Sequence, residues 1–397
     1  MHAEMSAKAP SFAPPLTLAL TGGPQEVVTA ALPALQSCAP ALVLIFCPRG
    51  SEVRALCAGI SDLLGTQCLV LACSSAGGFA YGGYDDEKTV LIAFPARHFR
   101  AGAVWLENLT QTPVMEWMRA LRPLERLEGA EAFPNHFGVL LIDGASGHEE
   151  LVTATCEAVI PSLMVVGGSA ADGLRFGRTH LALQGEERQV AAVFCRIATD
   201  FAIEEIILDH FTPEGDKIVV TDADPENRIL RELNAEPAAF EYARLIGVAP
   251  EALSPAVFAA HPLIETQGGR HFVRAIRGRD GAGGLSLMSA IETGAILGIG
   301  RAESLAERLA ARLDAMPAAE MVLGFDCVLR RLAVEQAGEE GRVADLYARH
   351  RVAGFSTYGE QHGGFHVNQT FVGLAFRAPA RHAPSQDGGD GDAWQHH

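Results

Sequence analysis

Short, almost uninterrupted apolar runs recur along the first half of the chain and constrain its fold more than any other feature. They are rich in Val, Ile, Leu and Phe and cover residues 41–47, 68–73, 89–94, 137–142, 163–166 and 190–195. Between several of them lie stretches such as 51–64 and 149–160, in which apolar residues recur at helical spacing. Strands that are apolar at nearly every position are typical of sheets buried on both faces. The alternation therefore predicts an α/β fold with mixed sheets covered by helices.

The second half resumes this pattern after a stretch of different character. Residues 209–236 are polar and turn-rich, and 212–216 (Thr-Pro-Glu-Gly-Asp) form an expected turn. After it we expect helices at 237–246 and 302–315 and strands at 272–277, 285–290, 321–327 and 367–376. A chain of 397 residues is too long for one ordinary core. The predicted division is an N-terminal segment (1–36), a first domain (37–232), a second domain (233–378) and a disordered acidic tail (379–397).

The charge balance excludes one class of partner. The formal net charge is −17, and the only lysines are Lys8, Lys88 and Lys217. Nucleic-acid surfaces need clustered Lys and Arg, so we expect no nucleic-acid binding.

The cysteines and the apolar content indicate the compartment. Eight cysteines are scattered without a C-x-x-C pair, which is typical of small buried hydrophobes in a reduced protein. Residues 1–15 do not resemble a secretory signal, and no run approaches the roughly 18 apolar residues of a membrane helix. We expect a cytoplasmic protein with no membrane contact.

The densest group of polar side chains lies at residues 354–370. This segment holds two histidines, a tyrosine, a carboxylate and several amides among four glycines. It is followed by the apolar run 371–376, which indicates a loop that leads into a buried strand. Three further loops rich in Gly and Ser, 73–78, 143–148 and 167–172, follow predicted strands. Ligands of α/β proteins gather at the carboxyl ends of strands, so we expect these loops to share one face.

Few catalytic patterns are present. Residues 167–171 (Gly-Gly-Ser-Ala-Ala) are one residue short of a nucleophile elbow, which would make Ser169 the nucleophile of a hydrolase, with Ser146 as a second candidate. Asp143 and Ser146 are better explained as turn and capping residues before a helix that carries Glu149 and Glu150 in its first turn. A phosphate-binding G-x-x-x-x-G-K-[ST] sequence is absent.

Four histidines stand out by their surroundings. His210 follows the apolar run 203–208 and adjoins Phe211, and His261 precedes a proline after apolar residues. His362 and His366 have helical spacing but lie among glycines, which excludes a zinc hydrolase helix. His210 could equally cap the end of a strand.

Several ordered motifs together carry a family resemblance. They are 73–78, 143–150, 166–172, the triplet 358–360 and the segment 366–370 (His-Val-Asn-Gln-Thr). The chain resembles the FIST sensory proteins, in both the N-terminal and the C-terminal halves of the domain, over residues 40–377. The resemblance implies a two-domain FIST-type architecture and a sensor rather than an enzyme.

Four further segments resemble the haem-binding, nitric-oxide-sensing branch of this family (NosP). They are 209–211, 234–244, 324–331 and 355–361. This resemblance implies a cytoplasmic sensor that binds haem, responds to nitric oxide and regulates a partner. The partner would be a histidine kinase or a cyclic-di-GMP synthase or phosphodiesterase, and the sensor itself could form a homo-oligomer.

The same resemblance implies the cofactor residues. A haem sensor needs a neutral imidazole on the iron and an apolar pocket. We expect His210 as the iron ligand, with His366, His261 and then His362 as alternatives, while Cys327 would pack in a strand. The haem would be non-covalent haem b, because a C-x-x-C-H sequence is absent. The expected cofactor-binding residues are Tyr358, Glu360, His366 and Asn368.

A second hypothesis is a sensor of a small organic ligand such as an amino acid. Its ammonium and carboxylate groups would suit a site with both an acid and helix N-termini. Tyr358, Glu360, Asn368 and Gln369 would grip this ligand together with the glycine-rich loops.

Overall fold

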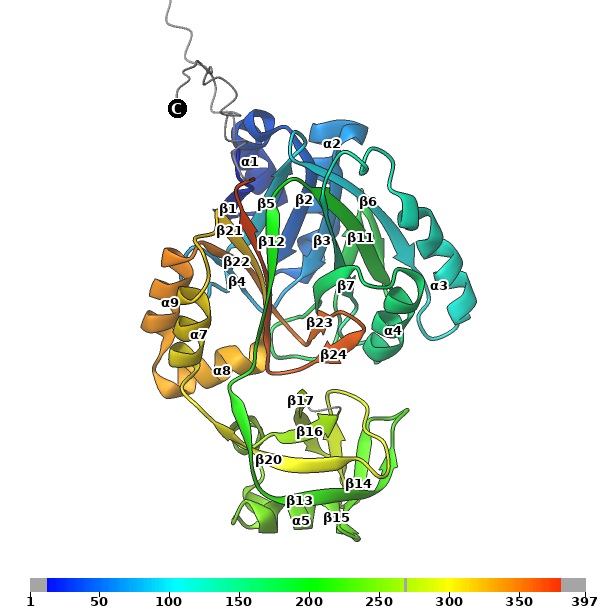
Figure 1. Ribbon diagram of the computed structural model, residues 1–397, viewed down its shortest axis with the longest axis vertical. Helices are drawn as coiled ribbons and strands as arrows, with labels where there is room; N and C mark the ends of the chain where they lie inside the picture. Colours follow the sequence, from blue (N-terminus) through cyan, green and yellow to red (C-terminus); the bar gives the residue numbers. More distant parts are fainter. Residues whose placement is uncertain (1–12, 268–269, 380–397) are drawn as a thin grey trace, which may run out of the picture.

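The computed structural model describes residues 13–267 and 270–379 of the chain. They form a large main body (residues 13–210 and 303–379) and a small domain (residues 211–302), which hangs below the main body in Figure 1. The predicted N-terminal segment lies partly, and the predicted disordered tail almost wholly, outside the described residues.

The first sheet of the main body has the strand order β1-β5-β2-β3-β9-β10. Only β2 and β3 run parallel in it. Helices α1 (Pro24–Cys38) and α2 (Val53–Leu64) cover its outer face with apolar side chains. The strands are β1 (Leu16–Leu20), β2 (Pro40–Cys47), β3 (Leu69–Ser74), β5 (Thr89–Pro95), β9 (Leu181–Leu183) and β10 (Glu186–Arg188).

The second sheet has the order β24-β23-β8-β7-β11-β6 and contains the parallel pair β7 and β8. Helices α3 (Val114–Leu121) and α4 (Glu149–Val159) pack on its outer face. The strands are β6 (Phe99–Leu106), β7 (Asn135–Ile142), β8 (Met164–Ser169), β11 (Ala192–Thr199), β23 (Glu360–His362) and β24 (Phe365–Val367).

The third sheet has the order β12-β25-β21-β22-β4, with β21 and β22 parallel. Its covering helices are α7 (Leu305–Asp314), α8 (Val328–Ala337) and α9 (Glu340–Arg349). The strands are β4 (Gly78–Ala80), β12 (Ala202–Leu208), β21 (Met321–Cys327), β22 (Val352–Thr357) and β25 (Phe371–Arg377).

One apolar core joins the three sheets, because each sheet turns its inner face toward the other two. Phe46 of the first sheet stacks on Phe355 of the third with ring centroids 4.4 Å apart, and Phe325 meets both rings edge-on. The predicted mixed sheets covered by helices are therefore confirmed. Strands β2, β5 and β21 are buried along their whole length, which explains why their sequences are apolar at nearly every position.

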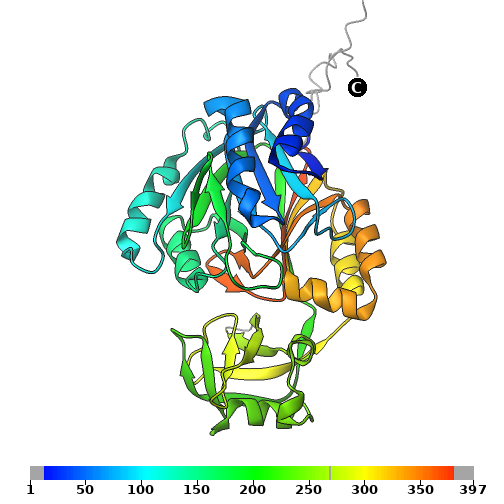
Figure 2. The same ribbon diagram turned by 180° about the vertical axis from the view of Figure 1, so that it is seen from behind.

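The small domain is an antiparallel sheet with the order β17-β16-β20-β13-β14-β19-β18, and β15 pairs with β14. Helices α5 (Ala238–Leu245) and α6 (Pro255–Ala260) close its own core. Figure 2 shows this domain from behind. The strands are β13 (Phe211–Asp224), β14 (Ile229–Leu233), β15 (Glu236–Pro237), β16 (Leu263–Gln267), β17 (Arg270–Arg274), β18 (Ile276–Arg279), β19 (Leu285–Leu287) and β20 (Ile296–Ala302). Four short 3₁₀ helices complete the described chain: η1 (Gly50–Glu52), η2 (Gly65–Gln67), η3 (Arg122–Arg126) and η4 (Pro250–Ala252).

Two local predictions were wrong. Residues 212–216 do not turn the chain but belong to the long strand β13, where the pairing with β20 is interrupted between Glu214 and Ile218. Gly215 has a φ of +79° there, so the turn-forming residues make an irregularity within a strand. Residues 354–370 are mostly strand rather than loop, because the end of β22 and the whole of β23 and β24 fall inside this segment. Only residues 358–359, 363–364 and 368–370 lie outside these strands.

The chain crosses between the main body and the small domain at two places. It leaves where β12 ends and β13 begins, and it returns where β20 leads into α7. The backbone N–H of Glu303 donates to the carbonyl of His210 over 2.8 Å, so the two crossings are tied together. Within residues 13–267 and 270–379, no helix has the length and apolar character needed to cross a membrane.

Candidate functional site

The three glycine-rich loops meet at the end of the main body that faces the small domain, as predicted. The N–H of Ala171 donates to the carbonyl of Ser74 over 3.0 Å, and that of Ala170 donates to Ile142 over 2.8 Å. Asp143 accepts from the N–H of Ala145 over 3.0 Å, which confirms its role as a turn residue. The predicted capping was wrong, because the N-cap of α4 is His148 and no side chain of the described residues makes a capping hydrogen bond there. Helix α4 follows with Glu149 and Glu150 in its first turn, as expected.

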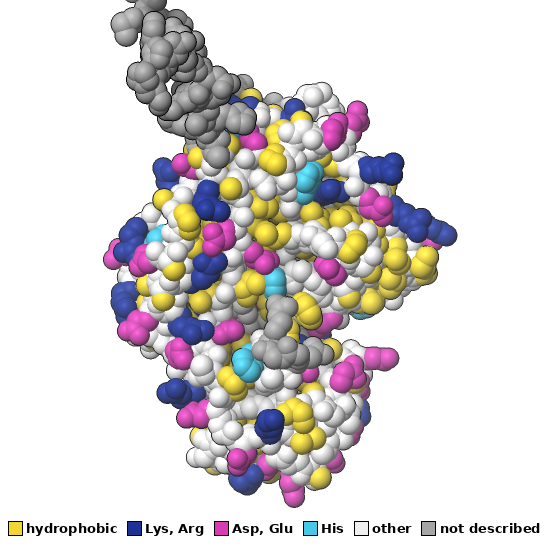
Figure 3. Space-filling view, viewed as in Figure 1, with side chains coloured by type: hydrophobic (Ala, Val, Ile, Leu, Met, Phe, Trp, Pro, Cys, Tyr) yellow, Lys and Arg dark blue, Asp and Glu magenta, His cyan; other side chains and the backbone are white. Residues whose placement is uncertain are grey.

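A cleft separates these loops from the small domain, and Figure 3 shows the indentation between the two parts. It consists of two adjoining hollows of about 370 Å³ each, which share Phe176, Arg277 and Met288. We call the first the polar cleft; its lining residues include Gly144, Ala145, Glu149, Asn227, Arg228 and Tyr358. We call the second the apolar slot, and the two together the interlobe cleft. Each volume lies within the range of small-molecule sites.

The apolar slot has walls from both parts of the chain. Phe258 and Ile276 come from the small domain, whereas Leu329 and Leu332 come from α8 of the main body. The exposed side chain of Leu174 forms part of the rim and also borders a third hollow of about 420 Å³ beside the glycine-rich loops. A ligand in the slot would therefore touch both parts at once.

Gln369 supplies the buried polar group of this slot. Its side chain is fully buried, and its Nε2 donates to the carbonyl of Ala259 over 3.2 Å. Its Oε1 has no hydrogen-bond partner within the described residues. The residue also has a φ of +51°, a left-handed conformation that is costly for a residue with a side chain. Strain together with an unpaired acceptor is typical of a binding residue.

Tyr358 shapes the loop between the two hollows. Its hydroxyl accepts from the N–H groups of Asp172 (3.2 Å) and Phe176 (3.0 Å) and donates to the Asp172 carboxylate. Its ring stacks on Phe176 with centroids 4.5 Å apart. Burial, reinforced by the Asp172 carboxylate, raises the pKa of Tyr358, so it remains a neutral phenol. This predicted binding residue lines the polar cleft.

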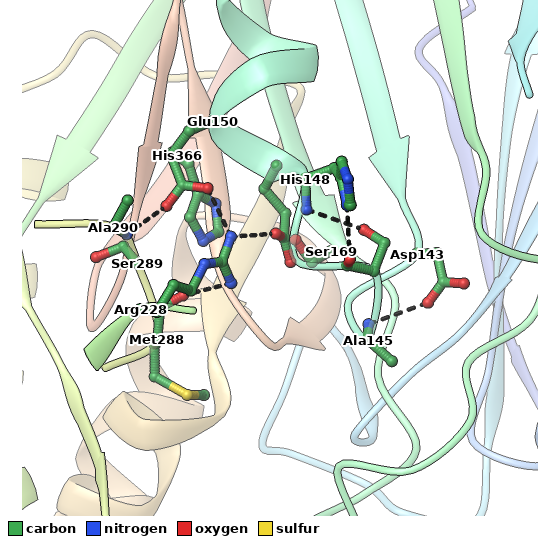
Figure 4. A network of polar contacts seen from close by, with 12 residues as sticks. Asp143, Ala145, His148, Glu150, Ser169, Arg228, Met288, Ser289, Ala290 and His366 are labelled. Carbon is green, nitrogen blue, oxygen red and sulfur yellow. Dashed lines mark hydrogen bonds and ion pairs between the residues drawn. The ribbon is translucent and has the colours of Figure 1, made fainter. Parts of the chain in front are cut away.

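Arg228 connects the small domain to the main body across the polar cleft (Figure 4). Its Nη2 donates to Glu149 and to Glu150 of α4, each over 2.5 Å, and its Nη1 donates to the carbonyl of Met288 over 2.9 Å. Glu150 also accepts from the N–H of Ala290 over 2.8 Å. We call this set the Arg228 latch. It ties the tip of the β13–β14 hairpin to the start of α4.

The electrostatics of the Arg228 latch favour its charged form. Burial alone would lower the pKa of Arg228, but the carboxylates of Glu149 and Glu150 outweigh this effect and raise it. Burial would likewise raise the pKa of Glu150, but the positive charges of His366, when protonated, and of Arg228 lower it. Burial outweighs the same carboxylates at His366 and lowers its pKa. The latch is therefore an ion pair beside a neutral imidazole.

His366 and Asn368 lie inside the main body and do not line the interlobe cleft. The two nitrogens of the His366 ring lie 3.4 Å from Gln361 Nε2 and 3.5 Å from Asn368 Nδ2. Gln361 also donates to Ser169 Oγ over 2.9 Å. Ser169 is fully buried, so a substrate cannot reach the hydroxyl without a rearrangement. The structure thus places these residues in one internal hydrogen-bonded group.

Glu360 is also fully buried, away from the interlobe cleft. It accepts from the Thr357 hydroxyl and from the N–H of Thr370, the latter over 3.2 Å. Burial raises the pKa of Glu360 well above its usual range; the hydrogen bond from Thr357 opposes this, and the nearby Asp326 carboxylate adds to it. Of the four predicted cofactor-binding residues, only Tyr358 borders the cleft.

His210 lies at the crossing between the main body and the small domain. Its side chain is 1% exposed, and its Nδ1 has no hydrogen-bond partner in the described part of the chain. Burial lowers the pKa of His210 well below its usual range, and the positive charges of Arg330 and Arg308 lower it further. The imidazole is therefore neutral, as an iron ligand must be. His210 is not among the residues that line the interlobe cleft.

The other two alternatives to His210, His261 and His362, also lie away from the interlobe cleft. His261 is exposed at the end of α6, and its carbonyl accepts from Tyr242 over 2.7 Å. His362 lies 2.7 Å from Glu205 and borders a separate open hollow beside α4. In the described residues, His, Cys, Asp and Glu side chains nowhere gather in threes to hold a bare metal ion. Haem would need only one protein ligand, so this finding does not bear on it.

Comparison with protein families identifies the chain. The family model described as the FIST N domain matches residues 41–236, and that of the FIST C domain matches residues 238–362. The chain belongs to the FIST family. FIST domains are sensory, so this FIST protein has a role in signal transduction. No curated protein matches it closely enough to add a finer assignment.

The sequence did not point to Arg228, to the walls of the slot or to the pairing with Glu149 and Glu150. Arg228 and Glu149 are 79 positions apart and belong to different parts of the FIST protein. The sequence indicated Gln369 only as one of several contacts of an organic ligand. That its side-chain oxygen is buried without a partner among the described residues could not be predicted, because this depends on the packing of the folded chain. One signal was available: a glutamine between an asparagine and a threonine just before an apolar strand.

Proposed function

We propose that this FIST protein senses a small ligand that binds in the interlobe cleft and changes the position of the small domain relative to the main body. The apolar slot carries this proposal, because its walls come from both parts. A ligand that touches both parts binds the closed arrangement more tightly than an open one, and so shifts the population toward it. The role has no catalytic step.

The two crossings suit such a motion. The chain connects the two parts covalently only at the crossings near His210 and Glu303, which one hydrogen bond joins. The Arg228 latch lies across the polar cleft and holds the two parts together by the ion pairs of Arg228 with Glu149 and Glu150 and by the N–H of Ala290, which donates to Glu150. The crossings can act as a hinge, and the Arg228 latch can be intact or broken. The two parts would therefore have a closed and an open arrangement, between which a ligand shifts the population.

The signal would pass to a partner enzyme in the cytoplasm. We propose a histidine kinase or a cyclic-di-GMP synthase or phosphodiesterase, on the basis of the resemblance to the nitric-oxide-sensing branch. The net charge of −17 supports a protein partner rather than nucleic acid. A homo-oligomer is compatible with this role. Kinase autophosphorylation measured with and without the ligand-loaded sensor tests the coupling.

A thermal-shift screen of small organic acids and amino acids tests the cleft itself. Ligand binding stabilises the native protein by mass action, so at a fixed concentration a ligand of higher affinity raises Tm further. Leu174→Ser removes an apolar side chain that is 52% exposed at the rim of the slot and should weaken the ligand's effect. Met115→Ser is the matched control, since Met115 is 55% exposed on α3. Equal loss in both variants, or no effect in either, would contradict binding in the slot.

A second candidate is a haem-based nitric oxide sensor, and His210 favours it. His210 is neutral and buried, and its Nδ1 lacks a hydrogen-bond partner among the residues that the structure describes. His210 follows β12, and Gln369 precedes β25. These two strands pair, with Leu208 opposite Phe371, so His210 and Gln369 each lie two residues from the same paired position. The chemistry of the residue therefore fits an iron ligand, and haem b bound there would supply iron for nitric oxide. The slot of about 370 Å³ would have to widen toward His210 to admit a porphyrin.

The haem candidate is tested by colour and absorption. Protein purified from haem-supplemented cells should show a Soret band that shifts with nitric oxide. His210→Gly should lose the band and regain it with added imidazole, whereas His261→Gly should keep it. Haem retention and an unchanged spectrum in His210→Gly would remove His210 from this role. His366→Gly and His362→Gly then test the remaining ligands.

A further inference from the structure

The ligand class can be narrowed from the polar groups that border the apolar slot. This inference rests on the proposed role of the interlobe cleft and adds what the ligand must present to it. A buried polar group without a partner is costly unless something in the site satisfies it. The carbonyl oxygen of Gln369 is such a group.

The orientation of the Gln369 amide is set by the protein. Its Nε2 donates to the Ala259 carbonyl, which leaves Oε1 as the free end in a side chain that lines the slot. Gln369 is fully buried, so water does not satisfy this oxygen, and a ligand in the slot reaches it only when the side chains around it move on binding. An amide oxygen only accepts hydrogen bonds, so it selects an N–H or O–H donor on the ligand.

The apolar walls of the slot and Arg277 at its mouth restrict the shape and the charge of the ligand. The walls are apolar, with Phe258, Ile276 and Leu332 among them, and a volume of about 370 Å³ suits a small bicyclic ring. Arg277 stands where the slot meets the polar cleft, with its guanidinium 5.9 Å from the centre of the Phe176 ring. It makes no ion pair with a carboxylate of the described residues.

We propose that the apolar slot binds a planar, apolar carboxylic acid that carries a ring N–H or O–H. The ring lies between the walls of the slot, its N–H or O–H donates to Gln369 Oε1, and its carboxylate pairs with Arg277. Arg recognises carboxylates by paired hydrogen bonds, and exposure at the slot mouth leaves its donors available.

Three probes separate these contributions by calorimetric titration. Indole-3-acetate has the ring, the N–H and the carboxylate; 1-methylindole-3-acetate lacks the N–H, and indole-3-acetamide lacks the carboxylate. The expected result is that the wild-type protein binds the first probe at least about tenfold more tightly than the second, because a buried acceptor would be left unpaired. A smaller loss is expected for the acetamide, since Arg277 is exposed.

Variants identify the residue responsible. Gln369→Met keeps the length of the side chain but removes the acceptor, so it should bind the methylated and unmethylated acids equally. Gln369→Glu restores an acceptor and should restore the preference. Gln361→Met is the matched control, because Gln361 is also fully buried with an unpaired Oε1 but does not line the slot. It should keep the preference of the wild type.

Two outcomes would overturn the assignment. Equal binding of indole-3-acetate and 1-methylindole-3-acetate to the wild type would show that Gln369 does not accept a hydrogen bond from the ligand. A preference for indole-3-acetate that persists in Gln369→Met would show the same. Failure of all three probes to bind would reject this ligand class. The proposed sensory role of the interlobe cleft would then be decided by the Leu174→Ser comparison in the thermal-shift screen, which covers amino acids and other small organic acids.

Discussion

Replacing Arg228 by methionine removes the charge of the Arg228 latch while keeping much of the side-chain volume. The change leaves Glu149, whose side chain is only 3% exposed, without its cation. Breaking a buried ion pair by removing one partner costs about 3–5 kcal/mol. Arg228 and Glu150 are 16% and 31% exposed, so solvent should recover part of that cost. We expect a loss of about 2–3 kcal/mol in the free energy of unfolding.

Urea denaturation of the wild type, Arg228→Met, Glu149→Gln and the double variant measures this effect as a double-mutant cycle. A coupling free energy of about 1–2 kcal/mol is expected between the two residues. Arg119→Met is the control, because its ion pair with Glu116 is exposed and should contribute no more than about 0.5 kcal/mol. Hydrogen exchange of the Ala290 amide, which is bonded to Glu150, should also become faster in Arg228→Met.

A loss no larger than that of Arg119→Met, or a coupling free energy below about 0.5 kcal/mol, would show that the Arg228 latch does not stabilise the fold. Arg228 also has a φ of +54°, which is unfavourable for a residue with a side chain. Arg228→Gly separates the two contributions, since glycine relieves the backbone strain while removing the same charge. It should be less destabilising than Arg228→Ala.

Three further outcomes follow from the buried polar groups. Gly359→Ala should lower stability by about 1–3 kcal/mol in thermal unfolding, because the added Cβ would lie 2.3 Å from Cε1 of His366, whereas Gly341→Ala in open space should not. The raised pKa of Glu360 means that the native state holds a proton that the unfolded state releases above about pH 4.3, so stability should fall as pH rises. Glu360→Gln should flatten that slope in urea titrations at pH 5 and 8. The lowered pKa of His210 acts in the opposite direction: the unfolded state gains a proton below about pH 6.5, so stability falls with acid, and His210→Gln should reduce this loss between pH 7 and 5.

Much of the fold could be predicted because its signals are local. The apolar runs at 41–47 and 137–142 became β2 and β7, and the amphipathic stretch at 149–160 became α4. The prediction of a turn at 212–216 was wrong because pairing with a distant strand outweighed the local signal. Its residues have turn propensity, but pairing with β20 on both sides of the irregularity extends them into β13.

The candidate site was only partly predictable. The glycine-rich loops and Tyr358 border the hollows at one end of the main body, and the sequence indicated a shared face for these loops because carboxyl ends of strands and sharp turns can be recognised in it. Glu360, His366 and Asn368 belong to the same segment, yet they face the interior. Glu360 and His366 lie in β23 and β24, which pair with each other and join the second sheet through β8, whereas Tyr358 lies in the bend before β23 and borders the polar cleft. This pairing joins segments far apart in the chain, so the local sequence does not show it.

The sequence by itself determined that this chain is a FIST protein with mixed sheets, covering helices and glycine-rich loops on one face. Composition, periodicity and turn residues are properties of a few adjacent positions, so they are visible before folding. Only the tertiary structure decided that Arg228 reaches Glu149 and Glu150 and that α8 and the small domain enclose an apolar slot. It also decided that the side-chain oxygen of Gln369 has no hydrogen-bond partner in the described part of the chain. Each of these depends on distances between segments far apart in the chain, which are set by the packing of whole sheets and helices against one another.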